Sequence, residues 1–167
     1  MKVIFLDIDG VLNDNNYFMS NHDVVKKMYQ ERKYHSDDIT FNVDLEMMNI
    51  DLNKLAILKD ITDKTGAKVV ITSSIKKKKY YSYIESKLIG FGIPIIGVTE
   101  DDISNRGTGI RHYLEEHDVS EYVILDDDIF DDYDHELLNN LIKTSFFDGG
   151  LKEEHREILI RKLIKKH

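Results

Sequence analysis

Short apolar runs that each end in a cluster of polar residues constrain the fold of this chain more than any other feature. Residues 3–6, 69–71 and 122–125 are apolar or aromatic throughout and too short for a helix. Runs of this kind predict strands that are buried on both faces, as in a parallel sheet. Weaker strand candidates are residues 95–98, which follow the only proline, and residues 142–145.

Helical patterns separate these runs. Leucine, alanine and isoleucine recur at helical spacing over residues 52–61, where Asp51 can cap the amino end and Gly66 can end the helix. Similar patterns cover residues 110–114 and 158–164. Strands that alternate with helices predict an α/β fold, a Rossmann-like three-layer sandwich with a mostly parallel central sheet. The length of 167 residues fits a single domain.

One long polar segment, residues 14–43, interrupts this alternation between the first strand and the first clear helix. Its pattern predicts one helix, around residues 24–32. A connection longer than about 12–15 residues commonly forms a functional lid or a flexible segment. We therefore expect a small lid or flap, and hence a minimal cap, within one domain that spans residues 1–167.

Composition excludes several classes of protein. The chain has no Cys, which excludes a disulfide scaffold, a thiolate zinc site, an iron–sulfur cluster and a cysteine nucleophile. Its opening segment, MKVIFLDIDGVLND, contains charged side chains and no long apolar region. We therefore expect neither a signal peptide nor a membrane anchor, and a cytoplasmic protein without a membrane partner. The net charge of −8 argues against nonspecific coating of nucleic acid.

The acidic charge is concentrated in one region. Residues 100–136 hold 14 acidic and two basic residues, so the rest of the chain is net basic. Such a segment is either a solvated face or a cation site, and its composition alone does not separate the two.

A run of four lysines, residues 76–79, is the main basic feature, and three tyrosines lie within the next four residues. One interpretation is a basic, aromatic wall for a polyanion, with tyrosine stacking on a base. The other is an ordinary helix, in which Tyr81, Ile84 and Leu88 pack inward and the lysines stay in solvent.

The polar clusters at the ends of the strong strands indicate the chemistry. Carboxyl ends of parallel strands share one edge of a sheet, so residues far apart in sequence meet there. Crowded carboxylates repel each other unless a cation or a proton offsets their charge, and oxygen ligands suit Mg²⁺. The sequence therefore predicts a magnesium and phosphate site. Its candidate residues are Asp7 and Asp9, then Thr72, Ser73 and Ser74, then Asp126, Asp127 and Asp128.

The segments that hold these clusters are FLDIDGVL, VVITS and VILDDD, in that order. Together they resemble the nucleophile, phosphate-binding and acidic motifs of the haloacid dehalogenase (HAD) superfamily, in its phosphatase branch. The later segments NRGTGIRHYL and KTSFFDGGL are similar to the HAD-type domain found with "Swiss Army Knife" RNA repair proteins. The resemblance spans most of the chain. It implies a HAD-like fold, Mg²⁺ as cofactor and a phosphorylated substrate.

The resemblance assigns roles to the first motif. Asp7 would attack phosphorus as a carboxylate nucleophile and form an aspartyl phosphate. Asp9 would first protonate the leaving oxygen and then activate the water that hydrolyses the intermediate. Gly10 would permit the tight geometry that follows the strand.

The same resemblance implies the metal and phosphate ligands. Thr72 would hold a phosphate oxygen through its hydroxyl, with Ser73 as the alternative if the register differs by one residue. Mg²⁺ would offset the repulsion between nucleophile and phosphate. Its ligands would be Asp7, the backbone carbonyl of Asp9, and Asp126 or Asp127.

A basic residue is also expected between the second and last motifs, normally a lysine. No Lys lies between Lys87 and Lys143, which departs from the superfamily pattern. Arg106, at the start of a predicted helix, is the best candidate for this phosphate-binding role. Arg111 and Lys76 are the alternatives.

Two functions from different classes fit these residues. The first is a Mg²⁺-dependent phosphomonoester hydrolase. Its expected open site, the lysine run and the similarity to the domain of RNA repair proteins favour nucleic-acid or nucleotide phosphate ends as substrates. The second is a catalytically quiet regulatory module that binds phosphate and metal. The presence of both Asp7 and Asp9 favours the hydrolase. A phosphorelay receiver domain would carry its acidic pair and its phosphoacceptor in the reverse order.

Overall fold

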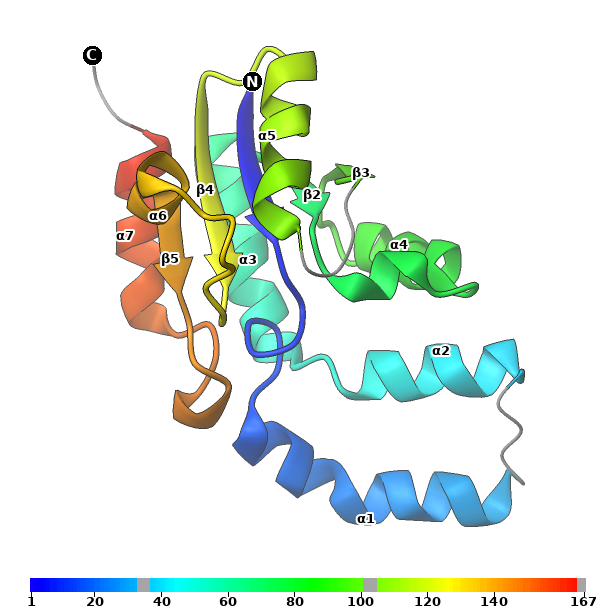
Figure 1. Cartoon of the computed structure of the whole chain (residues 1–167). Coiled ribbons are helices and arrows are strands. Elements are labelled where there is room, and N and C mark those ends of the chain that lie inside the picture. The colour runs from blue at the N-terminus through cyan, green and yellow to red at the C-terminus, as the bar shows by residue number, and fades with distance from the viewer. Residues whose placement is uncertain (33–36, 101–104, 165–167) are drawn as a thin grey trace.

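The strands form one five-stranded parallel sheet (Figure 1). The computed structural model describes residues 1–32, 37–100 and 105–164. The strand order is β3-β2-β1-β4-β5, and each neighbouring pair runs parallel. The predicted α/β fold is therefore confirmed. The strands are β1 (Lys2–Leu6), β2 (Lys68–Ile71), β3 (Ile95–Val98), β4 (Glu121–Asp126) and β5 (Leu141–Lys143).

Helices cover both faces of the sheet and complete the three layers (Figure 1). Within the described ranges, no helix is both long and apolar enough to cross a bilayer. The helices on one face are α3 (Leu52–Thr65), α4 (Tyr81–Gly90) and α7 (Glu153–Leu163), and those on the other are α5 (Arg106–Glu116) and α6 (His135–Asn140).

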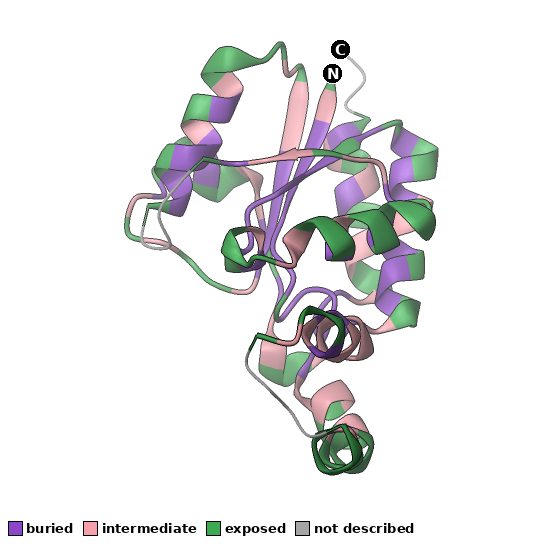
Figure 2. Ribbon diagram, turned by 90° about the vertical axis from the view of Figure 1, so that its right-hand side faces the viewer, coloured by how far each residue is buried: buried purple, intermediate pink, exposed green. Residues whose placement is uncertain are grey.

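The central strand β1 shows why its sequence is continuously apolar. Ile4 and Leu6 belong to the larger apolar cluster, which includes side chains of α3, α4 and α7. Val3 and Phe5 belong to the smaller cluster, with side chains of α5 and α6. All four are 0% exposed, because successive side chains of a strand point to opposite faces and both faces are covered (Figure 2).

Local signals set several element boundaries as predicted. The Asp51 side chain accepts a hydrogen bond from the Asn53 amide at the start of α3, and Gly66 ends that helix with φ of 71°. The strand β5 begins and ends earlier than the expected residues 142–145. The amide of Thr144, the next residue, still donates to the carbonyl oxygen of Asp126 at 3.0 Å, and its hydroxyl donates to that of Gly10 at 2.6 Å.

The polar segment over residues 14–43 holds more helix than its sequence indicates. The prediction of one helix around residues 24–32 was wrong, because α1 spans Asn15–Glu31 and a second helix, α2, spans Ile39–Met48. The side chains of Asp14 and Asp38 cap these two helices. Residues 33–36 lie outside the described part of the chain. The lid role of this segment remains a prediction.

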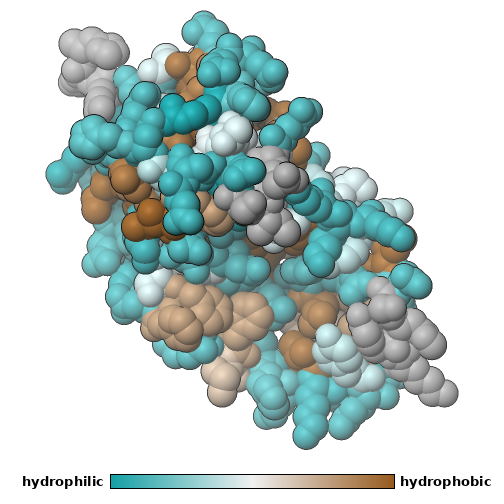
Figure 3. Space-filling view, viewed as in Figure 1, coloured by the Kyte–Doolittle hydropathy of each residue, from teal (hydrophilic) through white to brown (hydrophobic). Residues whose placement is uncertain are grey.

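These two helices, named the insert helices below, lie beyond the carboxyl ends of the strands and run antiparallel to each other (Figure 1). α2 lies beside α4, and α1 is outermost, with no buried residue (Figure 2). Phe18 of α1 contacts Phe146, which follows β5, with ring centroids 5.6 Å apart. Apolar side chains gather over this part of an otherwise largely hydrophilic face (Figure 3).

A buried lysine connects the insert helices to the body of the domain. The Lys54 ammonium of α3 lies 2.9 Å from the Asp14 carboxylate, which caps α1. The same ammonium donates to the carbonyl oxygen of Gly149, 2.6 Å away, in the loop after β5. Lys54 and Asp14 are only 8% and 5% exposed. One cation thus joins the starts of α1 and α3 to the far edge of the sheet.

Lys54→Met is expected to lower the free energy of unfolding by about 3–5 kcal/mol, because it leaves the buried Asp14 carboxylate without its cation. The matched control is Lys59→Met on the same helix, where the lysine pairs with Asp63 and both side chains are largely exposed. That change should cost less than about 1 kcal/mol. Denaturant-induced unfolding measures both variants. Equal losses would contradict the structural role of Lys54.

Candidate active site

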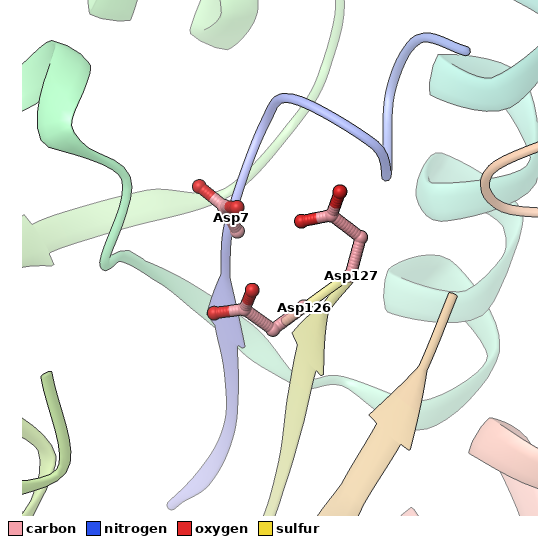
Figure 4. Close-up of side chains that lie close together, drawn as sticks. All are labelled: Asp7, Asp126 and Asp127. Atoms are coloured by element: carbon pink, nitrogen blue, oxygen red, sulfur yellow. The ribbon is translucent and has the colours of Figure 1, made fainter. Parts of the chain in front are cut away.

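Three carboxylates from two neighbouring strands meet at the carboxyl edge of the sheet. Asp7 directly follows β1, Asp126 is the last residue of β4, and Asp127 follows it (Figure 4). One oxygen atom of each lies within 4.8 Å of one from each of the others. The amide of Asp7 donates to the carbonyl oxygen of Leu125 at 2.9 Å, which continues the pairing of β1 with β4. Parallel pairing therefore brings these distant aspartates together.

The loop after β1 places Asp9 and Gly10 beside this group. The side chain of Asp9 is exposed and accepts a hydrogen bond from the Asn13 amide group at 2.9 Å. Gly10 has φ of 76°, and a Cβ there would lie 2.1 Å from Asp127 Oδ2. Only glycine lets the backbone at residue 10 lie this close to the Asp127 side chain without displacing it. Asp9 lies outside the three-carboxylate group, so its side chain is available for a separate role.

Arg106 supplies the positive charge at the carboxylates. One of its terminal nitrogens lies 2.6 Å from Asp126 Oδ2 and 3.3 Å from Asp7 Oδ2. Arg106 is 5% exposed, and its guanidinium carbon lies 4.4 Å from the centre of the Phe130 ring. Its contact with Asp7 places this cation beside the candidate nucleophile.

The two alternatives to Arg106 have other partners. The Lys76 ammonium donates to the carbonyl oxygen of Thr72 at 3.2 Å and to the Thr99 hydroxyl at 2.8 Å. Arg111 forms an ion pair with Asp134. Lys76 therefore lies beside the candidate phosphate-binding strand end, whereas Arg106 contacts the carboxylates themselves.

The position of Arg106 depends on a contact that the sequence did not reveal. The carboxylate of Asp132, in the loop after β4, accepts hydrogen bonds from the amides of Gly107 at 3.0 Å and Thr108 at 2.8 Å. It thereby caps α5, which begins at Arg106. A Cβ at Gly107 would lie 2.6 Å from the Asp132 carbonyl oxygen, so glycine permits this contact. Asp132 thus caps the helix that precedes it in the chain.

Burial and mutual repulsion raise the pKa values of the three carboxyls. The pKa of Asp7 rises to about 6, chiefly through burial and then through repulsion by Asp126, with the Arg106 guanidinium acting in the opposite direction. Burial also raises the pKa of Asp126 and, together with repulsion by Asp7, that of Asp127. The site therefore favours an additional positive charge, which a proton or a metal ion can supply.

A buried hydroxyl lies at the end of the adjacent strand. Thr72 follows β2, and its amide donates to the carbonyl oxygen of Leu6 at 2.9 Å. Thr72 is 1% exposed, and its hydroxyl has no hydrogen-bond partner among the described residues. Ser73, by contrast, accepts a hydrogen bond from the Ile75 amide at 3.4 Å and caps a short helix. Of the two candidate hydroxyls, that of Thr72 is free to bind a ligand.

The lysine run lies next to this strand end. Lys77, Lys78 and Lys79 are exposed. Tyr81 packs against the larger apolar cluster, to which Ile84 and Leu88 of α4 belong. This inward packing agrees with the helix interpretation of the run. The aromatic wall interpretation has one exposed candidate here, Tyr83, at 56% exposure.

Three features define a HAD-like α/β domain. They are the order of the strands, the DxDG segment that begins at Asp7 directly after β1, and the acidic group at the carboxyl ends of β1 and β4. A family model described as "HAD domain in Swiss Army Knife RNA repair proteins" matches residues 3–156. The chain belongs to this family, as its motifs predicted. Membership supports a phosphatase-like function in general terms. No curated protein and no solved structure matches the chain.

Replacement of Arg106 should change the acidity of Asp7. In metal-free protein, Arg106→Met is expected to raise the pKa of Asp7 above about 6, because the guanidinium lowers it. The control is Arg111→Met, on the same helix, which should leave this pKa unchanged because Arg111 pairs with Asp134 instead. Titration of the carboxyl carbons by NMR measures both. An unchanged Asp7 titration in Arg106→Met would contradict the electrostatic coupling.

Proposed function

We propose that the protein is a Mg²⁺-dependent phosphomonoester hydrolase that acts through an aspartyl phosphate on Asp7. The observation that carries this proposal is the close group of Asp7, Asp126 and Asp127, in which the two buried members, Asp7 and Asp126, contact Arg106. Membership of the HAD family independently supports a phosphorylated substrate. No single strand end would be sufficient, because the chemistry needs a nucleophile, a cation and phosphate ligands at one point.

The carboxylates fit a magnesium site. Their oxygens lie close together and are hard-oxygen donors, and burial, followed by repulsion between the aspartates, raises the pKa values of Asp7 and Asp127. Asp7 and Asp127 would hold the ion with the backbone carbonyl of Asp9, while Asp126 holds Arg106 and remains an alternative ligand. Bound Mg²⁺ would reduce the repulsion between the Asp7 carboxylate and a phosphate dianion.

The reaction takes place in two steps. In the first, an oxygen of the Asp7 carboxylate attacks phosphorus, the bond from phosphorus to the alcohol oxygen breaks, and the Asp9 carboxyl gives its proton to that oxygen. In the second, Asp9 takes a proton from water, whose oxygen attacks phosphorus. The bond to Asp7 then breaks and releases inorganic phosphate. One water molecule is consumed, and both aspartates return to their starting state.

Two donors would bind the phosphate oxygens. Thr72 has a buried hydroxyl without a partner in the described ranges, beside the strand that ends at Asp7. The Nε of Arg106 is also buried without a partner there, while a terminal nitrogen of the same guanidinium holds Asp7 and Asp126. Buried donors without partners are costly, and a bound phosphate would satisfy them.

The substrate class follows from the neighbourhood of the site. The exposed lysines 77–79 lie just after the phosphate-binding strand end and would attract a polyanion. We therefore propose nucleic-acid or nucleotide phosphate ends as substrates, in keeping with the description of the family. A quiet regulatory module is the second candidate, and only turnover distinguishes it from the hydrolase.

Asp7→Asn should abolish phosphate release, because an amide cannot act as the nucleophile. Release of inorganic phosphate from p-nitrophenyl phosphate, 3′-phosphorylated oligonucleotides, phosphopeptides and sugar phosphates would be measured with and without Mg²⁺. Asp131→Asn changes an exposed aspartate of the same acidic segment and should retain activity. Failure of the wild-type protein to release phosphate from any of these substrates would overturn the proposal.

Gly10→Ala should weaken Mg²⁺ binding by about tenfold or more, because the added Cβ meets Asp127 Oδ2 and moves that ligand. Gly97→Ala is the matched control, since a Cβ at Gly97 in β3 meets no atom within 4 Å. Isothermal titration calorimetry with MgCl₂ compares the two variants. Equal affinities would show that Asp127 does not contribute to the metal site.

A further inference from the structure

A long apolar groove lies between the insert helices and the helices that cover one face of the sheet. Its main part is a cavity of about 760 Å³, walled by α1, α2, the start of α3 and the end of α4. A hollow of about 460 Å³ adjoins it at Asp44 and Lys87, and another of about 160 Å³ adjoins it at Leu52 and Phe91. None of the strand-end residues of the candidate active site lines these three hollows, so the groove is a separate feature.

The groove presents apolar side chains to solvent. Met28 of α1 faces Met47 and Met48 of α2 across the main cavity, and all three are only partly buried. Leu52 and Phe91 remain 56% and 48% exposed. Methionine side chains adapt to irregular partners, and exposed apolar surface that is gathered in one place marks an interaction site. The outermost helix, α1, has no buried residue, so the described chain covers little of its surface (Figure 2).

A glycine at the end of α4 leaves open space over the groove. Gly90 lines the main cavity, and a Cβ built there would meet no described atom within 4 Å. Its φ is not in the left-handed region, so the backbone does not require glycine at this position. Glycine is also a poor helix former. Packing within the described chain therefore gives no reason for it, whereas a partner that approaches α4 closely would need the missing side chain.

The walls of the groove determine what kind of chain can occupy it. Most of its lining residues belong to helices, whose backbone groups already bond within each helix. An extended peptide would bury its own amides and carbonyls there without partners, which is costly. An α-helix satisfies those groups internally and offers apolar side chains at i, i+3, i+4 and i+7 spacing. The groove therefore suits an amphipathic helix.

The charged side chains of the lining indicate the charge of that helix. Arg32 and Asp44 pair with each other at 2.6 Å. Lys87 lines both larger hollows, is exposed, and has no hydrogen-bond or ion-pair partner within the described ranges. The groove thus carries one unmatched positive charge where its two larger parts join. An acidic side chain on the occupant would complement it.

We propose that the groove binds an amphipathic α-helix of a partner protein, with its apolar stripe against the three methionines and a glutamate or aspartate opposite Lys87. Close approach of this helix at Gly90 brings it against the end of α4. The interaction uses none of the residues assigned to phosphate chemistry, so it is independent of the proposed hydrolase.

Methionine methyl groups report occupation of the groove directly. Three of the five methionines, Met28, Met47 and Met48, line the groove. Met1 and Met19 do not line it and serve as internal controls. The full chain, labelled with carbon-13 at its methionine methyl groups, would be titrated with a probe peptide long enough for a stable helix, about 16 residues. The peptide carries leucine at i, i+3, i+4 and i+7 spacing and glutamate on the flanks of that stripe.

We expect the NMR signals of the three groove methyls to shift with the acidic peptide, while those of Met1 and Met19 stay in place. A peptide of identical composition, with its leucines spread around the helix, should shift none of them, because it has no apolar stripe to bury. A third peptide, with lysine in place of glutamate, should bind about tenfold more weakly than the acidic one.

Two variants test the charge and the space. Lys87→Glu should reverse the preference, so that the lysine peptide binds more tightly than the glutamate peptide. Gly90→Leu fills the groove and should weaken both peptides by about tenfold or more. Leucine is the better helix former, so thermal unfolding should show no loss of stability in Gly90→Leu. Lys26→Glu, at an exposed lysine of α1 outside the lining, is the matched control and should bind as the wild-type protein does.

Several outcomes would overturn this inference. They are unchanged groove methyls at millimolar acidic peptide, equal shifts of all five methionines, and unaltered binding in both Lys87→Glu and Gly90→Leu. Groove methyls that shift with protein concentration in the absence of peptide would show that a second copy of the chain covers the groove, which also contradicts a helical partner. Phosphate release plays no part in these measurements, so the proposed hydrolase stands or fails separately.

Discussion

The pairing of Arg106 with Asp126 and Asp7 is the interaction on which the site depends. Asp126 is fully buried and Asp7 nearly so, and two such carboxylates on adjacent strands would repel each other without a cation between them. The guanidinium in turn is fixed by the capping of α5 from Asp132 and by the face of Phe130. The acidic strand ends and the amino end of α5 therefore stabilise one another, and neither is a separate feature of the fold.

The insert helices lie at the same edge of the sheet as the three carboxylates (Figure 1). They leave the sheet immediately after the first motif and return to it at α3, so they lie over the carboxyl ends of the strands (Figure 1). The buried pair of Lys54 with Asp14 holds their starting point, and the bond from Tyr80 to Glu46 holds α2 against the body. An insertion at this point of the chain can therefore lie over the edge that carries the three carboxylates without altering the sheet (Figure 1).

Sequence patterns predicted those features that local rules determine. The strands follow from apolar runs with two buried faces, the caps of α3 follow from Asp51 and Gly66, and the meeting of Asp7 with Asp126 follows from parallel topology. The second insert helix escaped prediction because its apolar residues are spread around the helix and form no clear stripe. Glu46, Phe130 and Asp132 escaped because their partners lie on other elements, and only tertiary packing creates those contacts.

The acidic segment over residues 100–136 shows why a net charge must be divided by position before it is interpreted. Residues 101–104 lie outside the described part, but the described aspartates serve distinct purposes. Asp126 and Asp127 contribute to the buried group, whereas Asp132 and Asp134 cap helices. The choice between a solvated face and a cation site was therefore too narrow. Only the buried carboxylates carry an electrostatic cost that a bound cation would relieve, and the proposed magnesium site follows from those residues alone.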